Sequence, residues 1–192
     1  MHKRDEPIRQ KIIISAISCI EKSGLRGLTV RAIAKEAGVN VAAVNYYFGS
    51  KENLLDALMK QTLEHMLMDI REMMTGNPRE MLKNIFTYLI GGAILYPNMT
   101  RAHLYDAFTA NDYRGAFVKR INPLLDELFP LIRPALRVKG EAEGRALVVQ
   151  MFYTGFFSAI MPDLFKKFWG ADLRDPGTLA RYIDTLLDAY LA

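Results

Sequence analysis

The stretch that decides the fold is residues 29–48, TVRAIAKEAGVNVAAVNYYF. Its apolar spacing and its breaks predict two short helices, at about residues 30–37 and 41–48. Thr29 and Asn40 precede these helices and are residue types that cap helix N-termini with a side-chain oxygen. The segment is therefore expected to be a pair of short, capped helices.

Four residues between and within these helices meet the demands of a helix-turn-helix. Ala34 provides the small side chain that two closely crossing helices need, and Gly38 tolerates the positive φ of a tight turn. Val44 faces inward and pins the second helix, while Val39 fills the corner. Their mutually consistent spacing predicts a helix-turn-helix.

The second helix then presents an outward face that fits the major groove of B-DNA. Asn45 can make a bidentate contact to adenine, and Val41 and Ala42 can pack on a thymine methyl. Tyr46 and Tyr47 reach most naturally to a phosphate or a base edge. The alternative interpretation is a plain helical hairpin with exposed aromatic side chains.

Working outward, a first helix is expected at about residues 7–23. Asp5 can cap it, Pro7 suits its first turn and Gly24 can end it. After the second short helix, Ser50 can cap a long helix that begins at Lys51.

The rest of the chain predicts long helices separated by Gly, Pro and Asn, at about residues 51–74, 78–95, 99–110, 113–136, 141–168 and 177–191. No strand pattern, repeat or low-complexity segment competes. The expected fold is all-α, with a three-helix DNA-binding domain at residues 1–50 and a helical ligand-binding and dimerisation bundle at residues 51–192.

Charge is distributed unevenly between these two parts. Residues 1–50 hold eight Lys or Arg against four Asp or Glu, which accounts for the whole formal charge of +4. The remaining residues are neutral in sum. The positive excess therefore lies where a polyanion would bind.

Several classes of protein are disfavoured by composition. The single cysteine, Cys19, leaves no internal disulfide, and the charged start lacks the apolar stretch of an export signal, so a cytoplasmic protein is expected. The uncharged runs 85–96 and 146–162 are shorter than a membrane-spanning helix. His2, His65 and His103 are too scattered for a metal site, and no cofactor is expected.

The segment from residue 29 to 55, TVRAIAKEAGVNVAAVNYYFGSKENLL, closely resembles the signature of the TetR family of bacterial repressors. The match extends back to about Arg9. The resemblance implies that residues 40–48 form the recognition helix and that Thr29 and Lys51 hold the DNA backbone. Asn45 departs from the pattern, because the family very often has Tyr there. The expected DNA-contacting set is Thr29, Arg31, Asn40, Val41, Ala42, Asn45, Tyr46, Tyr47 and Lys51.

The resemblance also implies a homodimer built from the last two long helices. The run 146–162 supports this independently, because it is apolar nearly all round and one bundle face cannot bury it. Small residues on this helix would allow close approach, and Phe157 and Ala159 are the expected dimer contacts.

An effector site is expected in the helical domain, whose length exceeds what a dimeric DNA-binding protein needs. Met66, Tyr88, His103 and Tyr153 are candidates to line a pocket for a small apolar or aromatic molecule. The default interpretation of these side chains is packing in the core.

The sequence therefore predicts a one-component regulator, most simply a repressor, that binds a palindromic operator as a dimer and releases it on binding an effector. One alternative is an all-α binding protein or enzyme without specific DNA binding, although no catalytic motif is visible. Another is a nonspecific architectural DNA-binding protein, which would need a broader basic surface.

Overall fold

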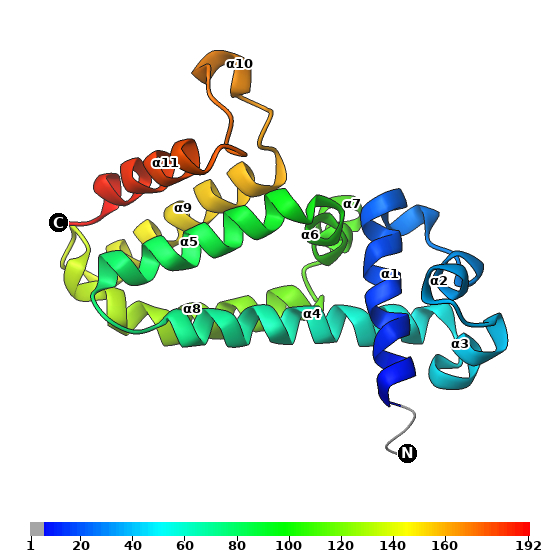
Figure 1. Ribbon diagram of the computed structural model, residues 1–192. Coiled ribbons are helices and arrows are strands. Elements are labelled where there is room, and N and C mark those ends of the chain that lie inside the picture. The colour runs from blue at the N-terminus through cyan, green and yellow to red at the C-terminus, as the bar shows by residue number, and fades with distance from the viewer. Residues whose placement is uncertain (1–5) are drawn as a thin grey trace. The chain divides into compact units, whose positions relative to one another are not determined.

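The computed structural model describes residues 6–192, so the expected cap Asp5 and the residue His2 lie outside the described residues. This range folds into helices and contains no strand, only an isolated β-bridge between Leu136 and Leu191. The all-α prediction is confirmed. The helices form two compact units, residues 6–66 with 98–112 and residues 67–97 with 113–192, and are labelled in Figure 1.

The first unit contains α1 (Glu6–Gly27), α2 (Val30–Ala37), α3 (Val41–Phe48), the beginning of α4 (Lys51–Met73), α6 (Pro97–His103) and α7 (Tyr105–Ala110). Its core is a single cluster of buried apolar side chains. Ile12, Ile13, Ile20, Ile33, Val44, Phe48, Leu54, Leu58 and Met99 are among its members. The expected three-helix DNA-binding domain, which we call the head, thus shares its core with α4 and α6.

The helices α2 and α3 begin and end where the sequence predicts, because their boundaries are set by local signals. The Thr29 side chain accepts a hydrogen bond from the Ala32 amide, and the Asn40 side chain accepts one from the Ala43 amide. The helical path of α1 is interrupted at Gly24, whose φ of 71° and ψ of 170° are non-helical. The following residues form one further turn, up to Gly27.

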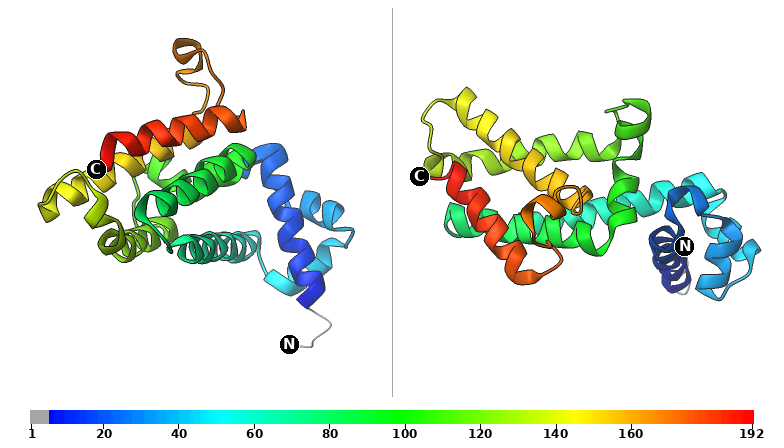
Figure 2. Two further views of the ribbon diagram at one scale, coloured as in Figure 1. Left: turned by 60° about the vertical axis from the view of Figure 1, so that its left-hand side comes forward. Right: turned by 90° about the horizontal axis from the view of Figure 1, so that it is seen from above.

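The second unit contains the end of α4, α5 (Pro78–Leu95), α8 (Ala116–Ile132) with the short 3-10 helix η1 (Arg133–Ala135), α9 (Glu141–Ile160), α10 (Lys166–Trp169) and α11 (Pro176–Tyr190). Figures 1 and 2 show α5, α9 and α11 side by side. Gly155 makes this packing possible, because a Cβ added there would lie 2.7 Å from the Phe86 ring. Lys83 of α5 and Asp184 of α11 form an ion pair at 2.8 Å.

Three of the predicted helices differ from the structure. The helix expected at 141–168 ends at Ile160, because Pro162 lacks an amide proton and disfavours helical backbone at Met161. The helix expected at 99–110 is broken into α6 and α7 at Leu104, where neither glycine nor proline marks the break. The helix expected at 113–136 begins only at Ala116 and ends in the 3-10 turn.

The two uncharged runs lie in helices of the second unit, chiefly in α5 and α9, and part of each is buried in its core. Over residues 6–192, no helix combines the length and the apolarity that crossing a membrane would require.

Candidate DNA-binding site

The turn between α2 and α3 has the geometry that the sequence predicts. Gly38 adopts left-handed backbone, with φ of 62° and ψ of 36°. The Val39 amide donates to the Ala34 carbonyl at 2.9 Å, which closes the end of α2. Val44 is only 2% exposed and fixes α3 to the core from inside. The turn and the core contact together hold α3 in one orientation.

The outward face of α3 carries the residues expected to read DNA. Val41, Ala42, Asn45 and Tyr46 are exposed, and Tyr46 is 77% exposed. Tyr47 is half-buried and meets the Tyr46 ring edge to face, with ring centroids 5.1 Å apart. The two aromatic rings thus brace each other at the edge of this face.

The two helix caps leave donors available for phosphate. Thr29 Oγ1 accepts from the Ala32 amide at 3.1 Å, so its own hydroxyl proton can still be donated outward. Asn40 Oδ1 accepts from the Ala43 amide at 2.7 Å, which leaves the side-chain NH₂ group as a donor. Arg31 is exposed in the first turn of α2. Both helix N-termini therefore have the character of phosphate-binding sites.

The beginning of α4 is tied to the end of α3. Ser50 Oγ accepts from the Asn53 amide at 3.1 Å, which confirms Ser50 as the cap. Asn53 Nδ2 donates to the Phe48 carbonyl at 3.0 Å. These bonds place Lys51 directly after the recognition helix, where an ammonium group can meet the DNA backbone.

The Glu36 carboxylate of the head is committed to contacts within the protein. Glu36 accepts hydrogen bonds from Lys22 Nζ at 2.6 Å and from Ser18 Oγ at 2.9 Å, which together join α2 to α1. The hydrogen bond from Lys22, followed by that from Ser18, lowers the pKa of the Glu36 carboxyl. Glu36 therefore stays ionised and partnered, and its charge opposes phosphate less than a free carboxylate would.

A joint between α1 and α6 is a feature that the sequence does not predict. The Glu21 carboxylate accepts from the backbone amides of Asn98, at 3.3 Å, and Met99, at 2.5 Å. Asn98 Nδ2 returns a hydrogen bond to the Glu21 carbonyl at 2.9 Å, and Met99 is buried in the core of the head. Nearby, the Arg26 guanidinium donates to the Tyr105 hydroxyl at 3.1 Å. The segment 98–112 is therefore held directly by the DNA-binding head.

Two of the proposed effector residues belong to this first unit. His103 Nε2 lies 2.9 Å from the hydroxyl of Thr62 on α4. Met66 follows Thr62 by one helical turn, so it lies on the same side of α4. His103 and Met66 are both half-buried. Burial lowers the pKa of His103 to about 4, which keeps the imidazole neutral at physiological pH.

The depressed pKa of His103 predicts a pH-dependent loss of stability. Below pH 6.5 the unfolded chain takes up a proton at His103 that the folded protein excludes until about pH 4. The free energy of unfolding should therefore fall by about 1.4 kcal/mol per pH unit through this window, and His103→Gln should remove this dependence. Urea unfolding of both proteins at several pH values measures the difference. His65→Gln, at an exposed histidine, is the matched control; parallel curves for wild type and His103→Gln would contradict the assignment.

The other two proposed effector residues belong to the second unit. The Tyr88 hydroxyl donates to Asp69 Oδ2 at 2.6 Å. Burial, and then the hydrogen bond to the Asp69 carboxylate, raise the pKa of Tyr88. Tyr153 is 63% exposed on the outward face of α9 and does not lie in the interior of its unit. Of these two, only Tyr88 has the burial expected of a pocket wall.

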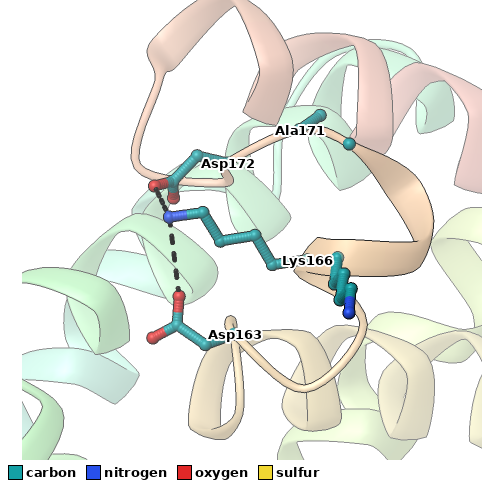
Figure 3. Close-up of a pocket in the computed structure, with 6 residues that line it drawn as sticks. Asp163, Lys166, Ala171 and Asp172 are labelled. Carbon is teal, nitrogen blue, oxygen red and sulfur yellow. Dashed lines mark hydrogen bonds and ion pairs between the residues drawn. The ribbon is translucent and has the colours of Figure 1, made fainter.

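A hollow of about 610 Å³ lies beside α10 and is lined by Asp163, Lys166, Lys167, Gly170, Ala171 and Asp172 (Figure 3). Lys166 Nζ lies 2.6 Å from Asp172 and 3.9 Å from Asp163. The ion pairs inside this hollow already satisfy most of its charged groups. Its lining does not suit an apolar effector.

The outward face of α9 is the expected dimer surface. Val149, Tyr153, Phe157 and Met161 recur every fourth residue and are between 41% and 63% exposed; we call them the α9 stripe. Phe157 is thus available to a partner. Ala159 is 4% exposed and faces inward, as Gly155 does, so these small residues serve packing within the protomer.

Among the residues that the structure describes, no three His, Cys, Asp or Glu side chains come together as metal ligands.

The rigid turn, the exposed recognition helix and the donors beside it define a helix-turn-helix DNA-binding protein. Residues 12–58 match the model of the bacterial regulatory proteins of the tetR family. The transcriptional regulator BetI of Rhizobium meliloti is 30% identical over 159 residues, 77% of each chain. BetI 2 of Chromohalobacter salexigens is 28% identical over 96% of this chain and 91% of its own.

The fold also matches that of a solved structure over the whole length of both chains. The crystal structure of a tetR-family regulator from Mesorhizobium loti superposes with a TM-score of 0.70 at 18% identity and covers 100% of both chains. The chain belongs to the TetR family, and it is a transcriptional regulator.

Proposed function

We propose that this regulator is a repressor that acts in the cytoplasm, binds a palindromic operator as a homodimer and releases it when a small apolar or aromatic effector binds. The observation that carries the proposal is the outward face of α3, which is held rigidly by Val44 and flanked by two helix N-termini.

The proposed contacts fall into two groups. Thr29, Arg31, Asn40, Tyr47 and Lys51 would hold phosphates and set the register, whereas Val41, Ala42, Asn45 and Tyr46 would meet base edges in the major groove. The first group supplies affinity that depends on salt. The second supplies specificity.

The dimer is proposed on the α9 stripe together with α11, with Phe157 near its middle. Two recognition helices related by a two-fold axis require an operator with the same symmetry. No catalysed reaction, cofactor or metal is part of the proposal.

Selection of bound duplexes from random DNA tests the proposal most directly. The bound pool should converge on an inverted repeat, and binding to it should fall steeply as salt rises. Equal affinity for the selected sequence and for a scrambled duplex would contradict specific recognition. That result would favour a nonspecific DNA-binding protein instead.

The effector is proposed to act through the segment 98–112. This segment holds the head through Glu21 and also carries His103, which contacts α4. An effector that favours a displaced position of α4 or α6 would alter the head through these same bonds. Met66 and His103 in the first unit and, separately, Tyr88 in the second unit remain proposed effector contacts, whereas Tyr153 is better placed for the dimer.

Glu21→Gln should loosen the joint between α1 and α6 without changing the size of the side chain. The glutamine keeps one acceptor oxygen but has an NH₂ group in place of the other, so one of the two backbone amides loses its partner. A hydrogen bond to a charged group contributes about 1.5 to 3 kcal/mol, so amide exchange at Asn98 or Met99 should accelerate by roughly 10- to 150-fold. Hydrogen exchange measures this in the absence of effector. Glu72→Gln, at an exposed carboxylate on α4, is the control.

The role of the joint in the response to an effector needs a second experiment. A thermal-shift screen of apolar metabolites first identifies compounds that bind the protein. For each hit that lowers operator affinity in the wild type, Glu21→Gln should reduce the effect several-fold. Unchanged exchange and unchanged response in Glu21→Gln would remove the joint from the mechanism.

A further inference from the structure

The segment between α9 and α11, residues 161–175, projects from the helices on either side of it (Figures 1 and 2). We call it the arm. Leu164 is 57% exposed, Phe165 69%, Phe168 93% and Trp169 43%. Four large apolar side chains within six residues are thus exposed to solvent in the isolated protomer.

The arm is nevertheless well ordered by its own contacts. Arg174 donates to both carboxylate oxygens of Asp163 at 2.8 Å. Lys166 donates to Asp172 at 2.6 Å, as Figure 3 shows. The hydrogen bond from Lys166, followed by the Arg174 amide, lowers the pKa of Asp172 to about 2. These ion pairs cross the base of the arm and hold its two ends together.

Apolar contacts fix the same end of the arm to the bundle. Leu173 is 5% exposed, and the Trp169 ring packs against that of Tyr182 on α11, with centroids 5.6 Å apart. The Tyr182 hydroxyl in turn hydrogen-bonds Ser158 of α9. Phe165 and Phe168 are therefore presented outward from a preorganised support, which lowers the entropy cost of binding something with them.

The exposed side chains of the arm follow the α9 stripe directly along the chain. Val149, Tyr153, Phe157 and Met161 follow one helix face to its end, and Leu164 and Phe165 come directly after it. Large side chains have about 150 to 250 Å² of surface each, so the stripe exposes roughly 400 Å² of side chain and the arm roughly 500 Å². A stable interface needs about 800 Å² from each partner. The helix α11, which is also part of the proposed dimer surface, has no large apolar side chain among the exposed ones, so the apolar surface of the stripe falls short of this area and that of the stripe with the arm reaches it.

We infer that the arm packs onto a second copy of this chain and completes the dimer surface that begins on the α9 stripe. This inference rests on the dimer proposed above. The occupant is a second copy because the arm directly follows that surface along the chain and supplies the apolar area that it lacks. The arm is neutral in sum, with three Asp against two Lys and one Arg, as suits contact with an identical chain.

The test uses the full chain and the double variant Phe165→Ser/Phe168→Ser. Both side chains are exposed, so the fold should be retained, and thermal melting at low concentration checks this. Sedimentation equilibrium should show a dimer dissociation constant raised by about tenfold or more. Phe108→Ser, at a phenylalanine that is 58% exposed in the first unit, is the control and should dimerise as the wild type does.

A photo-crosslinking amino acid at position 168 gives an independent readout and should yield a covalent dimer. Wild-type dissociation constants in the double variant, together with the absence of this product, would overturn the inference. If Phe157→Arg then still gave monomers, the proposed dimer would stand without the arm. A wild type that is monomeric at micromolar concentration would refute both. Flotation with anionic phospholipid vesicles that depends on Phe168 would assign the arm to a membrane surface and overturn the inference as well.

Discussion

Asn45→Ala should weaken operator binding by roughly 2 to 6 kcal/mol, which corresponds to about 30-fold to more than 10⁴-fold. A bidentate contact to adenine discriminates by about 1 to 3 kcal/mol, and a dimer makes the contact twice. The exposure of Asn45 on the outward face of α3 makes the contact possible. Titration of labelled operator at fixed salt measures the loss.

Two comparisons separate lost specificity from general damage. Replacing the contacted base pair in both half-sites should cost the wild type as much as the variant loses, and should cost the variant little. Lys51→Ala should instead weaken binding to every sequence alike and lower its salt dependence. If Asn45→Ala lowered the affinity for operator and for scrambled DNA by the same factor, Asn45 would not read a base.

Phe157→Arg should convert the protein to monomers and thereby reduce operator affinity by about 10² to 10⁴-fold. Phe157 is 53% exposed in the middle of the α9 stripe, where a guanidinium would be buried without a partner. Two monomers bind the two half-sites independently, so they lose the high effective concentration that a dimer gives its second DNA-binding head. Sedimentation and operator titration of the same sample measure both effects.

The control for this substitution is Phe108→Arg, which adds the same charge at a similarly exposed phenylalanine. It should remain dimeric and bind the operator. A charge at Ala159 is a poorer test, because Ala159 is 4% exposed and the substitution would disturb the protomer itself. A Phe157→Arg variant that sediments as a dimer would place the interface elsewhere.

The parts of the structure that the sequence predicts are those with local signals. Thr29, Gly38 and Asn40 mark ends of α2 and α3 with chemistry that acts within three or four residues, so both helices begin and end as predicted. Pro162 carries an equally local signal, but the apolar run before it favours a longer helix than the one observed. A backbone constraint overrides hydrophobic pattern at that position.

The parts that the sequence does not predict depend on contacts between distant residues. Glu21 and Asn98 are 77 positions apart, and neither residue type in isolation indicates that a carboxylate will cap a helix from another element. The orientation of Tyr153 also depends on such distant contacts. Periodicity places it on a helix, but its outward orientation follows from the packing of α9 against α5 on the other face, through Gly155 and Phe86.

The separation of buried and exposed residues in α3 has a consequence for engineering. Only Val44 and Phe48 of its eight residues are buried, while Val41, Ala42, Asn45 and Tyr46 are exposed. A library randomised at these four positions would leave the buried residues and the Asn40 cap intact, so most of its members should fold. Selection against chosen half-sites could then retarget this scaffold to new promoters. Each variant should keep the proposed response to an effector, because the substitutions lie outside the helices proposed to bind it.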